Sequence, residues 1–145
     1  MNMVEEMVQL SDDELLRYAR QVLLDGWDMD AQLRLKTIGA GGLGCPASET
    51  LVRAGVGYVH LIDDDEIEAS NLQRQTLFLP DDIGRPKALT AAHMLARINP
   101  LIKARGTVAR LDEYNAYELL DMAAGKPDLL LDCTDNFATR DIINR

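Results

Sequence analysis

Basic residues, cysteines and long apolar runs are scarce in this sequence of 145 residues, and each scarcity excludes a class of protein. The 15 Lys and Arg are outnumbered by 24 Asp and Glu, giving a formal net charge of −9, which argues against a nucleic-acid-binding protein. No run approaches the ~18 apolar residues of a membrane span. The acidic amino terminus lacks the basic-then-apolar pattern of a signal peptide. We therefore expect a cytoplasmic domain that binds neither nucleic acid nor a membrane.

The two cysteines, Cys45 and Cys133, are isolated in the sequence. They provide neither a disulfide framework nor a CxxC zinc site. Neither has a histidine nearby in sequence, so we interpret both as packing residues rather than nucleophiles.

What the sequence does contain is an alternation of strand-like and helix-like segments. Strand-like runs at 58–63, 102–111 and 128–132 are separated by helical patterns, and the run at 128–132 is apolar enough for a strand buried on both faces. The alternation predicts βαβ units, and hence an α/β, Rossmann-like fold with a mainly parallel sheet. A helix over 11–25 is predicted before this fold, because Ser11 and Glu14 form a capping-box pattern.

We accordingly divide the chain into an N-terminal helical segment, 1–37, and a nucleotide-binding domain, 38–145. The strand that should lead into the domain is short, since only Thr37 and Ile38 directly precede the first glycine of a glycine-rich loop.

That loop, "IGAGGLGCP", matches G-x-G-x-x-G through Gly39, Gly41 and Gly44, and Gly42 adds a fourth glycine. Small residues at these positions let backbone N–H groups and a helix N-terminus approach a phosphate chain. Asp63 follows nineteen residues after Gly44, where the dinucleotide fingerprint places an acid that binds ribose. By strand alternation Asp65 points the same way, so we assign both acids to nucleotide binding.

Two stretches favour a triphosphate over a nicotinamide cofactor. "SNLQRQ" offers Ser70, Asn71, Gln73 and Arg74, and "GRPK" offers Lys87. Fixed cations and amide donors stabilise the charge that develops when the α-phosphate is attacked and pyrophosphate departs.

Asp135 and Asn136 come directly after the apolar strand 128–132. Ligands of open parallel sheets bind outside the carboxyl ends of the strands. We expect Asp135 to bind Mg²⁺ there, with Asn136 beside it, although an Asx turn or helix cap is the alternative for both residues.

Taken together, "LLRYARQVLL", "GAGGLGCPASETLVRAGVG", "LIDDDEIEASNLQRQTLF", "GRPKALTAAHMLARINP" and "LLLDCTDNFATRDIIN" resemble the MoeB/ThiF branch of the E1-like activating enzymes. The blocks follow the family's order and cover most of residues 15–145. "SNLQRQ" and "DCTDN" are far more specific to this group than the glycine loop is.

The resemblance implies an adenylyltransferase that uses ATP and Mg²⁺ to activate the C-terminal carboxylate of a ubiquitin-like sulfur carrier of MoaD or ThiS type. It places Gly42 at the phosphates, Asp63 at the ribose and Asp135 at Mg²⁺. It places three further residues at the triphosphate: Asn71, Arg74 and Lys87. It also implies a homodimer, in which Arg20 is an arginine finger that reaches the ATP of the opposite subunit.

The family pattern continues into a second half that carries paired zinc-binding cysteines, so zinc is expected only there. The segment before Ile38 is also several residues shorter than in the family. A real deletion would weaken ATP binding, whereas residues missing from the sequence as given would have no consequence. Two alternatives therefore stand beside the adenylyltransferase: a nucleotide-binding fragment without activity, and an NAD-dependent oxidoreductase.

Overall fold

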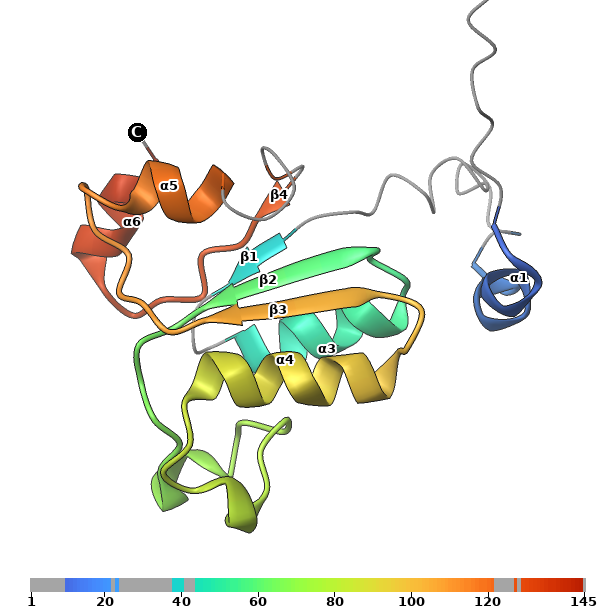
Figure 1. Ribbon diagram of the computed structural model, residues 1–145, viewed down its shortest axis with the longest axis horizontal. Helices are drawn as coiled ribbons and strands as arrows, with labels where there is room; N and C mark the ends of the chain where they lie inside the picture. The colour runs from blue at the N-terminus through green and yellow to red at the C-terminus, as the bar shows by residue number, and fades with distance from the viewer. Residues whose placement is uncertain are drawn as a thin grey trace, which may run out of the picture.

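The computed structural model describes residues 10–21, 23, 38–40, 44–121, 127 and 129–144 (Figure 1). The helices are α1 (Asp12–Tyr18), α3 (Cys45–Arg53), α4 (Lys87–Ile98), α5 (Ala116–Asp121) and α6 (Phe137–Ile143), with short 3₁₀ turns at Ala69–Asn71 and Pro80–Asp82. The strands are β1 (Ile38–Ala40), β2 (Tyr58–Ile62), β3 (Lys103–Thr107) and β4 (Leu129–Leu130). None of the helices in these ranges has the length and apolar character needed to cross a bilayer.

The four strands form one parallel sheet in the order β3-β2-β1-β4. The connections from β1 to β2 and from β2 to β3 run in one direction, through α3 and α4, which cover one face of the sheet (Figure 1). The connection from β3 to β4 runs back across the sheet through α5, so α5 and α6 lie on the other side. Right-handed crossovers produce this two-sided arrangement. The predicted Rossmann-like α/β fold is confirmed.

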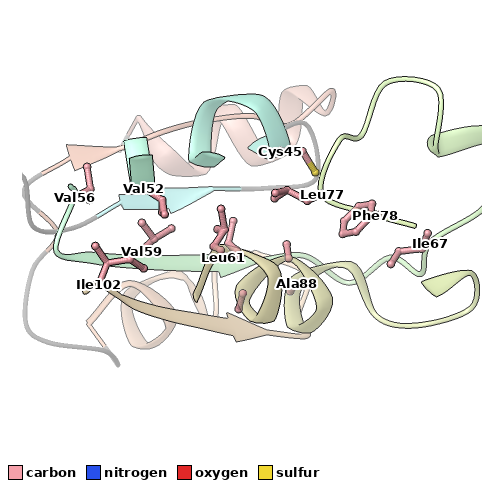
Figure 2. Close-up of a cluster of buried hydrophobic side chains, with 13 residues drawn as sticks. Cys45, Val52, Val56, Val59, Leu61, Ile67, Leu77, Phe78, Ala88 and Ile102 are labelled. Carbon is pink, nitrogen blue, oxygen red and sulfur yellow. The ribbon is translucent and has the colours of Figure 1, made fainter. Parts of the chain in front are cut away.

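The core lies between the sheet and the helices α3 and α4 (Figure 2). Val59 and Leu61 of β2 point into it and meet Val52 of α3 and Leu95 of α4, all of them buried. Gly106 of β3 faces the backbone of α4 so closely that a Cβ there would overlap Ala88. The first turn of α4 is therefore held tightly against the sheet.

The polar stretch between β2 and α4 is anchored at several points. Ile67, Leu77 and Phe78 are buried and extend the core beyond the sheet (Figure 2). Ile67 also exchanges backbone hydrogen bonds with Arg85 and Gly84, at 2.9 and 2.8 Å. The loop that carries "SNLQRQ" is thus a packed part of the domain.

Two local predictions are corrected. The predicted capping box of Ser11 and Glu14 is present, but α1 ends at Tyr18 rather than near residue 25. A turn follows it, in which the N–H of Gln21 donates to the carbonyl of Tyr18 at 2.9 Å. Leu129 is half exposed although its strand was predicted to be buried on both faces, because β4 lies at the edge of this sheet. Residues 24–37, including the short segment before Ile38, lie outside the described residues.

Candidate functional site: a polar pocket at the carboxyl edge of the sheet

A pocket opens where the parallel strands end, at the point where the strand order reverses. Segments following β2, β3 and β4 contribute to it, together with Arg74 and Gln75 from the loop before α4. Its lining residues are Ile62, Asp63, Asp64, Asp65, Arg74, Gln75, Ala109, Arg110, Leu111, Cys133, Thr134, Asp135, Asn136 and Thr139. Open α/β sheets bind their ligands in this crevice.

Asp63 directly follows β2 and lines the pocket; its binding of ribose remains a prediction. One of its carboxylate oxygens accepts a hydrogen bond from the backbone N–H of Asp65 at 2.8 Å. Burial raises the pKa of the Asp63 carboxyl, while that hydrogen bond and the nearby Lys87 ammonium act in the opposite direction. A partly desolvated carboxylate of this kind is suited to accept hydrogen bonds from two adjacent hydroxyls.

Lys87 is the first residue of α4 and is buried, yet its ammonium meets a carboxylate at the pocket. The Nζ atom lies 2.8 Å from Oδ2 of Asp65, whose side chain is 66% exposed. The backbone N–H of Lys87 also donates to the carbonyl of Asp65 at 2.9 Å. Asp65 therefore joins Lys87 to the pocket wall, although Lys87 itself is not one of the lining residues.

Arg74 lines the pocket and is exposed, with one guanidinium N–H donated to the carbonyl of Ser70 at 3.0 Å. The guanidinium has further N–H donors beyond this bond. Gln75, beside it, was missed by the sequence analysis. Its side chain is buried, it lines the pocket, and its Oε1 has no hydrogen-bond partner within the described residues. As the last residue of "SNLQRQ", it could have been included with its neighbours.

The other residues of that loop lie farther from the pocket. Asn71 is buried, and its Oδ1 accepts a hydrogen bond from the backbone N–H of Glu68 at 3.0 Å, a local capping contact. The Ser70 hydroxyl donates to the Glu68 carboxylate at 3.1 Å. Gln73 is exposed. None of the three lines the pocket, and their roles in nucleotide binding remain predictions.

Asp135 and Asn136 both line the pocket but have different local roles. Asn136 caps α6, because its Oδ1 accepts a hydrogen bond from the N–H of Ala138 at 2.9 Å. Asp135 is exposed, and within the described part of the chain no donor or cation engages its carboxylate. The carboxylates of Asp63, Asp64 and Asp65 lie within 4.8 Å of one another in the same pocket. Such oxygen ligands suit Mg²⁺.

The glycine loop is described only in part. Gly39 lies inside β1, paired with His60 and Leu130, and Gly44 caps the N-terminus of α3. Gly41 and Gly42 lie outside the described residues.

Arg20 is not brought into the pocket. It follows α1, which contacts the ends of α3 and α4, that is, the edge of the sheet where β2 and β3 begin. In Figure 1, α1 lies beyond the amino ends of the strands, whose arrows point away from it. The five residues of β2 alone separate the two edges by roughly 15 Å.

The two cysteine thiols do not have the character of nucleophiles. Burial raises the pKa of Cys45 to about 11. Burial also raises the pKa of Cys133, which lines the pocket, and the Asp132 carboxylate adds to that effect. Arg110 is a further pocket residue that the sequence analysis missed. Arg110 falls near the end of the predicted strand 102–111, and its place at the carboxyl end of that strand could have identified it.

A parallel sheet with cations, carboxylates and a Gly-capped helix at its carboxyl edge defines the class of Rossmann-like nucleotide-binding domains. The ThiF family model matches residues 18–145. The chain therefore belongs to the ThiF family.

Its curated relatives include molybdopterin-synthase adenylyltransferase of Escherichia coli strain K12, which is 46% identical over 143 residues, covering 95% of this chain and 56% of the relative. The sulfur carrier protein ThiS adenylyltransferase of the same organism is 44% identical over 140 residues, covering 93% and 54%. A solved structure of E. coli tRNA N6-threonylcarbamoyladenosine dehydratase in complex with ATP matches with a TM-score of 0.81 and 26% identity, over 94% of this chain and 56% of that one. The chain thus spans just over half the length of these relatives.

Proposed function

We propose that this chain is the adenylating part of an enzyme that activates the C-terminal carboxylate of a ubiquitin-like sulfur-carrier protein with ATP. The observation that carries the proposal is that charged residues from separate parts of the chain lie at one pocket. Asp63 after β2, Arg74 from the loop before α4 and Asp135 after β4 line one pocket, and Asp65 joins Lys87 to it. The curated relatives are named as adenylyltransferases of this kind, and the neighbouring dehydratase binds ATP.

The pocket supports a division of roles. Asp63 binds the ribose hydroxyls, and Arg74 and Lys87 neutralise the polyphosphate. The glycine loop from Gly39 to Gly44 supplies backbone N–H groups to the phosphates, and the "SNLQRQ" amides add donors. Asp135, whose carboxylate has no partner among the described residues, is the group best placed to hold Mg²⁺. Bound there, Mg²⁺ would offset charge on the phosphate oxygens.

The reaction needs no protein nucleophile. An oxygen of the carrier carboxylate bonds to the α-phosphorus as the bond to the bridging oxygen breaks, and pyrophosphate leaves with that electron pair. The chain's work is to align the two anions and to neutralise their charge. This agrees with Cys45, whose thiol remains protonated near neutral pH.

Arg20 fits this scheme only across subunits. Its helix lies at the amino edge of the sheet, roughly 15 Å from the carboxyl edge, which is farther than its own side chain can reach. We therefore propose a homodimer in which the segment 1–37 presents Arg20 to the ATP held by domain 38–145 of the partner. A cytoplasmic location completes the proposal.

Carrier-dependent ATP–pyrophosphate exchange tests the proposal. We expect exchange with a MoaD-type or a ThiS-type carrier, and none with a carrier whose C-terminal carboxylate is blocked. Arg20→Ala should reduce exchange, and mixing it with Asp135→Ala should restore part of it, because each mixed dimer then contains one complete site. Binding of NADH without binding of ATP would instead favour the oxidoreductase.

A further inference from the structure

Asn99 is a fully buried polar residue at the end of α4 that the proposed chemistry does not use. Its Nδ2 donates to the Tyr18 hydroxyl and to the carbonyl of Val52, both at 2.8 Å. Its Oδ1 accepts a hydrogen bond from the backbone N–H of Leu101 at 3.2 Å. One amide therefore connects the helix α1, the end of α3 and the turn that leads into β3.

Tyr18 is the last residue of α1 and is 2% exposed. Two neighbouring side chains strengthen the same junction: Arg17 donates to the carbonyl of Ile98 at 2.7 Å, and Gln21 donates to the carbonyl of Ala54. By contrast, Leu16, in the same turn, is 82% exposed. The contacts of Arg17, Tyr18 and Gln21 thus attach one side of the C-terminal end of the helix to the domain.

A helix of this length has little stability of its own. Isolated helices shorter than about 12–15 residues are marginal in water, and α1 has seven residues. Its capping box fixes the first turn, but the direction in which the last turn points depends on the contacts of Tyr18 and Arg17. Arg20 is exposed and follows Tyr18 by two residues, so the same contacts hold the stretch of backbone from which its side chain extends.

We propose that Tyr18 and Asn99 are positioning residues for Arg20: their buried hydrogen bond aims the arginine of one subunit at the nucleotide site of the other. This inference rests on the proposed function. The hydrogen bond lies at the amino edge of the sheet, away from the pocket of its own subunit. Losing it therefore impairs catalysis in the partner subunit while leaving the subunit's own nucleotide site intact.

Tyr18→Phe removes only the hydroxyl. Because small misplacements of a catalytic group cost up to 10²-fold in rate, we expect kcat for carrier-dependent exchange to fall by about 10- to 100-fold. The KM for ATP should remain close to that of the wild type. Tyr114→Phe is the matched control, since Tyr114 is 88% exposed and lies far from this junction in the sequence.

Subunit mixing distinguishes positioning from a general structural defect. In dimers of Tyr18→Phe with Asp135→Ala, the Tyr18→Phe subunit keeps an intact pocket and receives Arg20 from a normal α1. An equal mixture should recover up to about a quarter of the wild-type rate, because half of the dimers are mixed and each has one working site. A Tyr18→Phe subunit whose own pocket is damaged would show no recovery.

The possible outcomes distinguish a failure of the positioning role from a failure of the proposed function on which it rests. Wild-type exchange by Tyr18→Phe, or loss without recovery on mixing, overturns the positioning role even if Arg20→Ala behaves as proposed. Wild-type exchange by Arg20→Ala overturns the arginine finger itself. If Tyr18→Phe does not fold, Arg17→Ala serves instead: Arg17 is exposed, and loss of its bond to Ile98 should produce a smaller fall in kcat that mixing also reverses.

Discussion

The ammonium of Lys87 is paired with the carboxylate of Asp65 at 2.8 Å, and the two residues also share a backbone hydrogen bond. The buried ammonium at the start of α4 is thereby held next to a residue that lines the pocket. The Lys87 side chain is only 10% exposed, so the proposed role of its ammonium at the phosphates depends on this pairing with a pocket residue.

Asp65→Asn should disturb that arrangement without disrupting the core. Because Asp65 is largely exposed but Lys87 is buried, we expect the free energy of unfolding to fall by about 1–3 kcal/mol, between the values for an exposed and a buried pair. Exchange should fall by about tenfold, since Lys87 loses the partner that orients it. Urea unfolding and exchange assays measure the two effects, with Asp81→Asn, an exposed carboxylate that does not line the pocket, as the control. An unchanged exchange rate would show that Lys87 needs no partner at the wall.

Asp135→Ala should abolish exchange while leaving the fold intact. The residue is exposed and engages no partner within the described residues, so its loss should leave the melting temperature within error of the wild type. Loss of the proposed Mg²⁺ ligand should lower exchange by at least about 10²-fold. Asp81→Ala is the matched control, and wild-type exchange in Asp135→Ala would refute the metal role.

Asp63→Asn should make the protein more stable at neutral pH and less able to bind ATP. Burial raises the pKa of the Asp63 carboxyl in the folded state, so ionisation of this group costs folding free energy at pH values above that raised pKa. The asparagine removes this cost. The gain in stability should therefore be largest near pH 7 and shrink as the pH falls toward the ordinary value of 3.8. Thermal melts across this range, combined with ATP titrations, provide the measurement; an equal gain at every pH would point to a different cause.

Gly106→Ala should weaken both the fold and the site. The added Cβ would overlap the backbone of Ala88, which is adjacent to Lys87, so α4 must move away from β3. Overpacking of this kind costs about 1–3 kcal/mol. Gly84→Ala is an informative contrast: its Cβ would meet open space, and only the positive φ of 84° is strained. We expect both variants to lose stability in urea, but only Gly106→Ala to lose exchange beyond its loss of folded protein.

Much of the fold could be predicted because its signals are local. The capping box of Ser11 and Glu14, the strand Tyr58–Ile62 and the helix Lys87–Ile98 each follow from residues within a few positions of one another. The expectation that the carboxyl ends of the strands carry the site also placed Asp63 and Asp135 together, since parallel strands end at the same edge. The predictions that went wrong, the length of α1 and the burial of Leu129, depend on what each element packs against.

The sequence by itself determined which elements form and which charged groups stand at their ends, because neighbouring residues decide helix caps, strand alternation and turns. Only the tertiary structure decided that Gln75 and Arg110 join the pocket, that Asp65 holds Lys87, and that Arg20 stands at the opposite edge. The physical reason is distance along the chain. The hydrogen bond between Tyr18 and Asn99 joins residues 81 positions apart. No local sequence pattern predicts such a contact, because it forms only when the intervening chain has folded.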